Sequence, residues 1–367
     1  MAGPRGRACD GGPATSGVAF TLDLSGNAST LWTFASGPFA PVGPLVESAG
    51  ALIGTSCGGG ARNRGTVFRV TFTGQTTALA SFGGEFGECP TSLVRGTDGN
   101  FYGNTFTGTV FRMTEAGVLT ALYDLGPAAA SRQSLDTLTV DASGNLWGNW
   151  FDAGGAFVYR LTPEGSFTRF PLLDGAGAVG PGVSIGPGGD LFGAVPLLDL
   201  ADPQASSSQL FRMTPSGSLT PQFRFPAHDF AISRLIPASD GVLYGTTAAR
   251  TAMGTIFRAT PEGDVATLHT FTEAEGFTAL ADLTELPTGE LAGVTFGSPG
   301  WRAGLDYNFG IVFAMSKAGV LRELHRFTWL DGANPYGPLL RGSDGALYGN
   351  TTAGGLRGGG VIYRIPE

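Results

Sequence analysis

One eight-residue phrase recurs along the whole chain, and its period constrains the fold more than any other feature. It reads apolar, aromatic, Arg, x, Thr, x, x, Gly, and its clearest copies are VFRVTFTG from Val67, VFRMTEAG from Val110, VYRLTPEG from Val158, LFRMTPSG from Leu210 and IFRATPEG from Ile256. With three weaker copies, the aromatic falls at Phe20, Phe68, Phe111, Tyr159, Phe211, Phe257, Phe313 and Tyr363. The seven intervals from Phe20 to Tyr363 average 49 residues. A period of that size is typical of repeat folds such as propellers.

A second phrase lies between the copies of the first, and together they define a unit of four strands. Examples are TDGNFYGNT from Thr97, SDGVLYGTT from Ser239 and SDGALYGNT from Ser343. The apolar runs are short, rich in β-branched and aromatic residues, and separated by Gly, Asp, Asn or Pro, which indicates strands and tight turns. Glycine supplies 60 of the 367 residues, mostly at fixed places in these turns. Because both faces of each run are apolar, we predict an all-β, seven-bladed β-propeller with four-stranded antiparallel blades.

The two ends of the chain are expected to share the closing blade. We predict one propeller domain over residues 1–367, with residues 1–16 as an irregular N-terminal segment. Call the strands of a blade a to d, from the axis to the rim. The eight-residue phrase is expected to form strand c, the third strand of each blade. Its eight copies exceed the seven blades by one, so either VAFTL from Val18 or VIYRI from Val361 takes the third place in the closing blade. The sequence leaves this choice open.

Composition excludes two classes of partner. The formal net charge is −8 and the isoelectric point is near 5.0, which argues against nucleic acid because a basic face is needed for it. No run approaches 18 apolar residues, so no membrane span is predicted. We expect a monomer.

Propeller geometry places function on one face. The a–b and c–d turns are short and repeated, whereas the b–c and d–a loops vary in length and lie on the opposite face. Variable loops on a rigid scaffold are the usual place for binding. Residues that recur in every blade are interpreted as structural: the arginines Arg69, Arg112, Arg160, Arg212, Arg258 and Arg364, and the turn aspartates Asp98, Asp240 and Asp344.

Blade six departs most from the repeat and supplies the candidate ligand-binding residues. Its long insertion contains Trp301, Arg302, Asp306 and Tyr307, and the next d–a loop contains Trp329, Asp331, Asn334 and Tyr336. Aromatic rings with acids and amides suit carbohydrate, because sugar C–H faces stack on rings while polar groups bind hydroxyls. The alternative is that these aromatics only pack the loops together.

An axial catalytic site is the competing hypothesis. His228 and Asp229 lie in the loop that enters the first strand of blade five, close to the axis. With the nearby acid Asp282 they could serve a lyase or hydrolase that uses the axial pocket. The alternative for His228 is a solvated loop residue. His269 and His325 occupy equivalent places in TLHTF and ELHRF and are interpreted as structural. A third hypothesis is a structural or adhesive repeat unit.

The three cysteines allow one disulfide on the variable face. Cys57 lies in a b–c loop and Cys89 in the adjacent d–a loop, so a bond between them is compatible with the fold, as are free thiols. Cys9 aligns with Cys57 in the repeat. No pair of histidines has metal-ligand spacing, and no cofactor is predicted.

The repeat resembles the Gloeo/Verruco repeat family of bacterial exported proteins. PYGPLLRGSDGALYGNTTAGGLRGGGVIYR, from Pro335, is the best match. The resemblance implies a secreted or periplasmic protein but no particular activity, so the ligand-binding hypothesis rests on the variable loops. If the protein is exported, its leader has been removed, since MAGPRGRACD has no apolar segment. A looser resemblance links the segment from Thr139 to streptogramin-lyase-like propellers. It would imply Mg or Ca, but Asn149, Thr246 and Thr351 stand where those repeats carry Glu.

Overall fold

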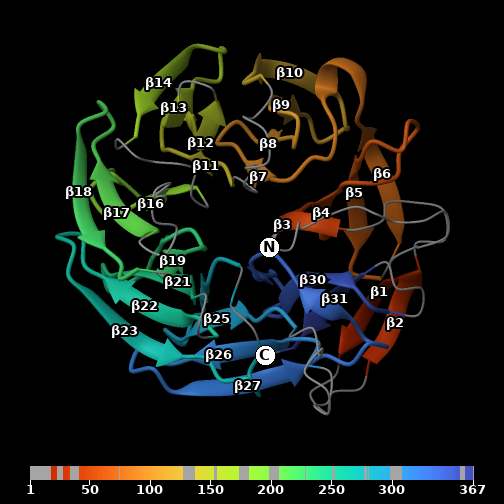
Figure 1. The fold of residues 1–367 in the computed structure, drawn as a ribbon. Coiled ribbons are helices and arrows are strands. Elements are labelled where there is room, and N and C mark those ends of the chain that lie inside the picture. Colours follow the sequence, from red (N-terminus) through yellow and green to blue (C-terminus); the bar gives the residue numbers. More distant parts are fainter. Residues whose placement is uncertain are drawn as a thin grey trace, which may run out of the picture.

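The computed structural model describes most of the chain as β-strands. The described residues are 18–22, 28–33, 41–73, 75–126, 137–152, 155–172, 182–197, 206–227, 229–249, 253–276, 279, 281–297, 308–355 and 360–366. The expected irregular segment 1–16 lies outside these ranges. Seven sheets are arranged as the blades of a ring (Figure 1), which confirms the predicted seven-bladed β-propeller. Within the described ranges, the one helical element is a 3-10 turn, η1 (Gly84–Phe86).

The first three blades each consist of four antiparallel strands in chain order from the axis outward. Blade 1 is formed by β3 (Pro41–Ser48), β4 (Ala51–Ser56), β5 (Thr66–Thr71) and β6 (Thr76–Ser81). Blade 2 is formed by β7 (Val94–Arg95), β8 (Phe101–Asn104), β9 (Thr109–Met113) and β10 (Leu119–Asp124). Blade 3 is formed by β11 (Thr139–Val140), β12 (Leu146–Asp152), β13 (Gly155–Leu161) and β14 (Phe167–Pro171).

Blades 4 to 6 repeat this order, with the first strand of blade 5 split in two. Blade 4 is formed by β15 (Val183–Ile185), β16 (Leu191–Leu197), β17 (Ser207–Met213) and β18 (Leu219–Arg224). Blade 5 is formed by β19 (Asp229–Ala231), β20 (Ile236–Pro237), β21 (Leu243–Ala249), β22 (Thr255–Ala259) and β23 (Val265–Thr270). Blade 6 is formed by β24 (Thr284–Glu285), β25 (Leu291–Val294), β26 (Ile311–Met315) and β27 (Leu321–Arg326).

The closing blade contains strands from both ends of the chain, as predicted. Its strands are β28 (Ala333–Pro335), β29 (Leu340–Arg341), β30 (Leu347–Ala353), β31 (Val361–Ile365), β1 (Val18–Leu22) and β2 (Ala28–Thr33). The segment VIYRI takes the third place, antiparallel to β30. VAFTL lies beyond it and pairs with it in parallel, and β2 forms the edge (Figure 1). This blade therefore differs from the other six by a parallel pairing and an additional strand.

The aromatic of each third strand explains the recurring glycine of the second strand. Phe68, for example, pairs with Gly54, and Phe313 pairs with Gly293. A Cβ placed on Gly54 or Gly293 would lie 2.6 Å from the Cζ of its partner's ring. Because a side chain cannot fit there, glycine lets the ring lie flat over the neighbouring strand. The second G in the DGxLYG phrase is thus a packing requirement.

The hydrophobic core lies between successive blades. A phenylalanine that follows the fourth strand packs edge-on against the third-strand aromatic of the next blade. The ring centroids are 4.9 Å apart for Phe82 and Phe111, and 5.0 Å apart for Phe225 and Phe257. This contact joins each of these blades to the next and accounts for part of the abundance of phenylalanine.

Candidate functional site

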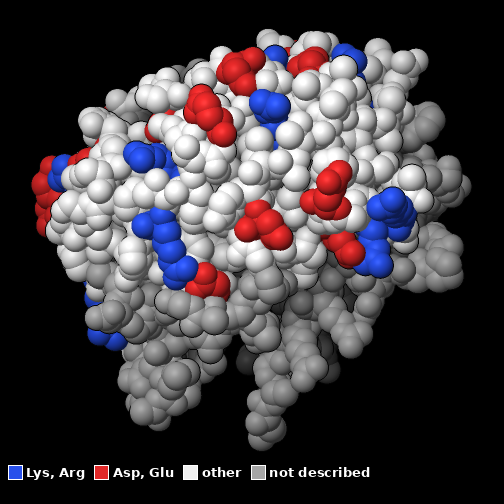
Figure 2. Space-filling model, turned by 90° about the horizontal axis from the view of Figure 1, so that it is seen from above, with Lys and Arg blue, Asp and Glu red and all other residues white. Residues whose placement is uncertain are grey.

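The antiparallel blades divide the connections between two faces. The a–b and c–d turns lie on one face, which we call the turn face, and the b–c and d–a connections lie on the other, which we call the loop face. Figure 2 views the ring edge-on and shows acidic and basic residues interspersed over the described surface, with no large area of one charge. The side that is visible carries no basic stripe of the kind that nucleic acid requires.

The aspartates of the turn face are committed to their own turns. Asp98, Asp240 and Asp344 accept hydrogen bonds from the tyrosine hydroxyl four residues later, at 2.8–2.9 Å. Each also accepts one from the backbone N–H two residues later, which forms an Asx turn. Burial raises the pKa of the Asp98 carboxyl, but hydrogen bonds from Asn100 and Tyr102 outweigh it and lower that pKa overall. The interpretation as turn chemistry is confirmed.

The recurring arginines also bond to the scaffold. Arg364 donates to Asp344 at 2.7 Å, Arg212 pairs with Asp190, and Arg69 donates to the carbonyl of Ala49. These three of the six arginines behave as predicted for structural residues, because their partners are acidic turns or a backbone carbonyl.

Serine–glutamate contacts cross between blades on the turn face. The backbone N–H of Ser239 donates to Glu285 of the next blade at 2.7 Å, and Ser343 makes the same contact with Glu47 across the closure of the ring. Lys317 adds an ion pair to Glu285 at 2.7 Å. The turn face therefore braces the blades against one another.

An ion pair between the partly buried Arg234 and the buried Asp282 lies near the axis. Both carboxylate oxygens of Asp282 accept hydrogen bonds from Arg234, one from its backbone N–H at 2.7 Å and one from its Nε at 3.1 Å. The Nη1 of Arg234 continues to the Oγ1 of Thr139 at 2.8 Å. Arg234 thus links blades 5, 6 and 3.

Repeat alignment contained a signal for this pair that sequence reasoning missed. Each blade has a buried Leu or Val in or next to its first strand, and the residue before it occupies the same place in every repeat. That residue is small or proline except in blades 5 and 6, where it is Arg234 and Asp282: the others are Pro44, Ser92, Thr137, Gly182 and Pro338.

The three predicted catalytic residues are not brought together by any described contact. His228 lies outside the described residues, and Asp229 is in β19 opposite Ala249. Burial raises the pKa of the Asp282 carboxyl, and the Arg234 guanidinium opposes that effect. Since Arg234 occupies both oxygens of Asp282, this carboxylate is engaged within the scaffold.

The two equivalent histidines hold two equivalent loops. His325 lies 3.1 Å from Asp331, whose other oxygen accepts the backbone N–H of Thr328 at 2.6 Å. His269 and Glu275 form the same arrangement one blade earlier, at 3.2 Å. The structural interpretation of both histidines is confirmed, and Asp331 is part of this loop support.

Exposed apolar side chains lie at the tip of that supported loop. Trp329 is 48% exposed and Leu330 is 72% exposed. The Trp329 ring packs edge-on against Phe309, with ring centroids 5.8 Å apart. The backbone carbonyl of Trp329 accepts a hydrogen bond from the N–H of Gly355. We call Phe309, Trp329 and Leu330 the rim patch. The sequence prediction included Trp329 but missed Leu330 and Phe309.

The other predicted ligand residues divide into two groups. Asn334 has a left-handed backbone with φ 56° and bonds through its N–H to the Phe309 carbonyl at 2.9 Å. Tyr336 is largely enclosed, and burial raises the pKa of its hydroxyl to about 12. The insertion residues Trp301, Arg302, Asp306 and Tyr307 lie outside the described residues.

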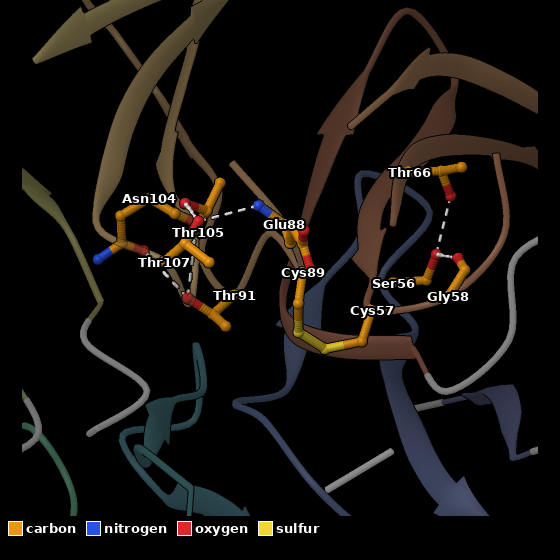
Figure 3. Close-up of a disulfide and its surroundings, with 10 residues drawn as sticks. All are labelled: Ser56, Cys57, Gly58, Thr66, Glu88, Cys89, Thr91, Asn104, Thr105 and Thr107. Carbon is orange, nitrogen blue, oxygen red and sulfur yellow. Dashed lines mark hydrogen bonds between the residues drawn. A yellow bond between two sulfur atoms is a disulfide. The ribbon is translucent and has the colours of Figure 1, made fainter. Parts of the chain in front are cut away.

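A disulfide joins Cys57 and Cys89 on the loop face (Figure 3). It connects the b–c loop of blade 1 to the connection that leads into blade 2. Around it, the Thr107 hydroxyl accepts the N–H of Glu88 at 3.0 Å, and Arg64 pairs with Glu88. The two connections are therefore held together both covalently and by hydrogen bonds.

Metal-binding clusters and membrane-spanning helices are both missing from the described residues. No group of three or more His, Cys, Asp or Glu in that part of the chain is placed to hold a metal ion. None of its helices is long and apolar enough to cross a membrane. The expectation that no cofactor is needed stays a prediction.

Comparison with solved structures shows similarity of fold. Puromycin hydrolase matches with TM-score 0.60 and 15% identity over 92% of this chain and 54% of the other. The extracellular domain of BT4673 from B. thetaiotaomicron matches with TM-score 0.57 and 12% identity over 88% and 38%. The WD40 propeller of Doa1 matches with TM-score 0.54 and 12% identity over 85% and 90%. The chain thus spans well under two thirds of the first two proteins.

Sequence comparison finds a matching family model but no matching curated protein. No curated protein matches the chain. The model of the Gloeobacter/Verrucomicrobia repeat matches residues 6–162 and 201–367, which is most of the chain. The unmatched stretch contains the last strand of blade 3 and the first two strands of blade 4. With the seven-bladed fold and the recurring phrases, this match shows that the chain belongs to the Gloeobacter/Verrucomicrobia repeat family.

Proposed function

We propose that this protein is an exported ligand-binding propeller whose loop face contacts a carbohydrate or a protein near blades 6 and 7. The observation that carries the proposal is the contrast between the faces. Turn-face aspartates, arginines and serines bond within the scaffold, whereas the rim patch presents Trp329 and Leu330 to solvent on a loop that His325 and Asp331 support. A rigidly held, exposed aromatic loses little entropy on binding.

Carbohydrate is favoured by the flat exposed indole of Trp329 and by the aromatics and polar groups of the adjacent insertion sequence. Aromatic rings stack against the C–H face of a sugar. A protein ligand would instead insert an apolar side chain between Trp329 and Leu330. The two ligand classes therefore require separate probes.

A glycan array and a pull-down with immobilised protein, each followed by titration, test the proposal. Trp329→Ala is expected to weaken binding at least ~30-fold, the loss that corresponds to removing a hot-spot aromatic. Val320→Ala is the matched control, because Val320 is 70% exposed in a c–d turn on the opposite face. Equal binding by the wild type and Trp329→Ala would contradict the rim patch as the site.

Export is supported by the disulfide, since such bonds persist in oxidising compartments. The fold similarity to an extracellular domain is consistent with it. Thiol labelling of the protein recovered from its native cells measures this directly. Unlabelled Cys57 and Cys89 are expected in a secreted or periplasmic fraction, and labelled residues in a cytoplasmic fraction would contradict export.

An axial lyase or hydrolase is the second candidate, and the observation that favours it is the buried Asp282 carboxyl with its raised pKa. If it holds, His228 and Asp229 act with Asp282, and Mg or Ca enters only through the lyase-like resemblance. His228→Ala separates the two functions: it abolishes turnover of a discovered substrate in the enzyme and leaves ligand binding unchanged in the binding module.

A further inference from the structure

The closing blade contains two strands, β1 and β31, whose sequences both match the third strand of a blade. The third strand of every blade pairs its aromatic with the glycine of the second strand, and β31 does so through Tyr363 and Gly349. β1 contains the same phrase with Phe20 at the aromatic position. The two strands lie side by side in parallel, with Phe20 opposite Tyr363 and Ala19 opposite Ile362. Equivalent residues are therefore partners in the pairing.

The pairing of β1 with β2 identifies β1 as a third strand rather than a fourth. In blades 1, 5 and 6 the register between third and fourth strands shifts immediately before the aromatic, at Val67/Phe68, Ile256/Phe257 and Val312/Phe313. The register between β1 and β2 shifts at Ala19/Phe20, the same place. β1 and β2 thus pair as the third and fourth strands of a blade do, and the described residues contain no separate first and second strands for them.

The observed closure has two unusual features, a parallel pairing and a buried tyrosine at the aromatic position; blade 3 also has a buried tyrosine there. β1 is parallel to β31, and it is the one parallel pairing between named strands in the described part of the chain. Tyr363 is 1% exposed, and its hydroxyl has no hydrogen-bond partner among the described residues, whereas five other blades have phenylalanine there. Both features disfavour this arrangement relative to the regular blade.

We infer that the ring has two alternative closures, which exchange β1 for β31 in the third place of the last blade. In the second closure β1 pairs antiparallel with β30, so that Phe20 pairs with Gly349 and Ala19 pairs with Asn350, and β2 becomes the fourth strand. The blade is then a regular four-stranded antiparallel blade, and β31 is released with its backbone groups unpaired. The fold thereby contains a strand that can be displaced without opening the ring.

Aspartate at the aromatic position tests whether a spare strand exists. Tyr363→Asp and Phe313→Asp are matched, because both rings are buried, both pair with a glycine and both pack against a preceding phenylalanine. Blade 6 has no substitute strand among the described residues, so Phe313→Asp is expected to abolish cooperative unfolding. Tyr363→Asp is expected to keep a cooperative transition, because β1 replaces β31. The double variant Phe20→Asp with Tyr363→Asp should lose it again.

Disulfide trapping in the full chain tests the second closure independently of stability. Ala19 and Asn350 both pair with Ile362 from opposite sides, so they are two strand spacings apart, about 10 Å, which is beyond the ~7 Å reach of a disulfide. In a Cys9→Ser background, Ala19→Cys with Asn350→Cys should cross-link on oxidation, and Ala19→Cys with Ile362→Cys serves as the control for the observed closure.

The outcomes decide the inference. A Tyr363→Asp variant as damaged as Phe313→Asp, together with cross-linking only in the control pair, overturns it. Cross-linking of Ala19→Cys with Asn350→Cys supports it even if Tyr363→Asp fails to fold, since that pair is within bonding distance only when β1 occupies the third place.

Discussion

The two faces of this propeller use the same strands in different ways. On the turn face the blades repeat a closed set of contacts: an aspartate bonded to its tyrosine, an arginine bonded to an acid or carbonyl, and a serine bonded to the next blade. On the loop face the contacts differ from blade to blade, with a disulfide at blades 1 and 2 and an exposed tryptophan at blades 6 and 7. Repetition therefore marks residues that hold the ring, and departures from it mark residues available for a specific task.

The largest expected effect compares a scaffold aromatic with the rim patch. Phe257→Ala should lower the free energy of unfolding by about 3–5 kcal/mol, because the ring is 1% exposed and leaves a cavity between blades. Trp329→Ala should lower it by no more than about 1.5 kcal/mol, the contribution of one aromatic pair, because the ring contacts Phe309 but nearly half of the side chain is exposed. Urea unfolding followed by far-UV circular dichroism measures both. Similar losses would show that Trp329 belongs to the scaffold.

The pair of Arg234 and Asp282 also departs from the repeat, but it lies inside the ring. It therefore tests whether every departure from the repeat serves function rather than stability. Arg234→Met should cost about 3 kcal/mol, because it leaves Asp282 buried without its partner. Arg212→Met is the control at the surface pair with Asp190 and should cost less than about 1 kcal/mol. If Arg234→Met with Asp282→Leu recovers most of the loss, the pair is a scaffold element and the axial enzyme hypothesis weakens.

The disulfide is the covalent departure on the loop face. Replacing Cys57 and Cys89 together by serine should lower the free energy of unfolding by about 2–4 kcal/mol, since the bond closes a loop between residues 32 apart in sequence. Cys9→Ser is the control and should leave stability unchanged. The Tm of the wild type with and without a dithiol reductant gives the same comparison, and no shift on reduction would contradict a stabilising role.

The smallest effect concerns a single repeated turn. Burial raises the pKa of the Asp240 carboxyl, but hydrogen bonds from Tyr244 and Lys317 outweigh it and hold that pKa below its usual range. The folded state thus binds a proton less readily than the unfolded state. The stabilisation is less than about 1 kcal/mol, because the Asp240 side chain is 36% exposed and solvent screens its interactions. It is present above the unfolded pKa and is lost as pH falls through the folded pKa.

Asp240→Asn measures that contribution. The variant should unfold at a lower temperature than the wild type near neutral pH, and the difference should vanish in acid, below the folded pKa of Asp240. A difference that persisted in acid would show that the substituted amide disturbs the turn for a reason other than the loss of charge.

Sequence reasoning reached the architecture because the signal is periodic. Each blade needs an aromatic over a glycine, a tight turn and apolar residues on both faces, so the same phrase appears wherever those needs recur. It reached the structural role of His269 and His325 for the same reason. It missed Arg234, although the alignment of the repeats shows a large charged residue at a place that is otherwise small or proline, because the contact from blade 5 to blade 3 exists only in the closed ring. It missed Leu330, because the exposure of a loop tip has no period along the chain.

The sequence by itself determined the seven blades, the order of their strands and the face on which the connections vary, because these follow from short-range patterns repeated along the chain. The tertiary structure decided what depends on residues far apart in sequence. It placed VIYRI rather than VAFTL in the third position of the last blade, joined Cys57 to Cys89, and paired Arg234 with Asp282 at the axis. VAFTL and VIYRI contain the same phrase, so the sequence alone does not distinguish which of them takes the third position of the last blade. Only the closed ring brings both strands to that blade.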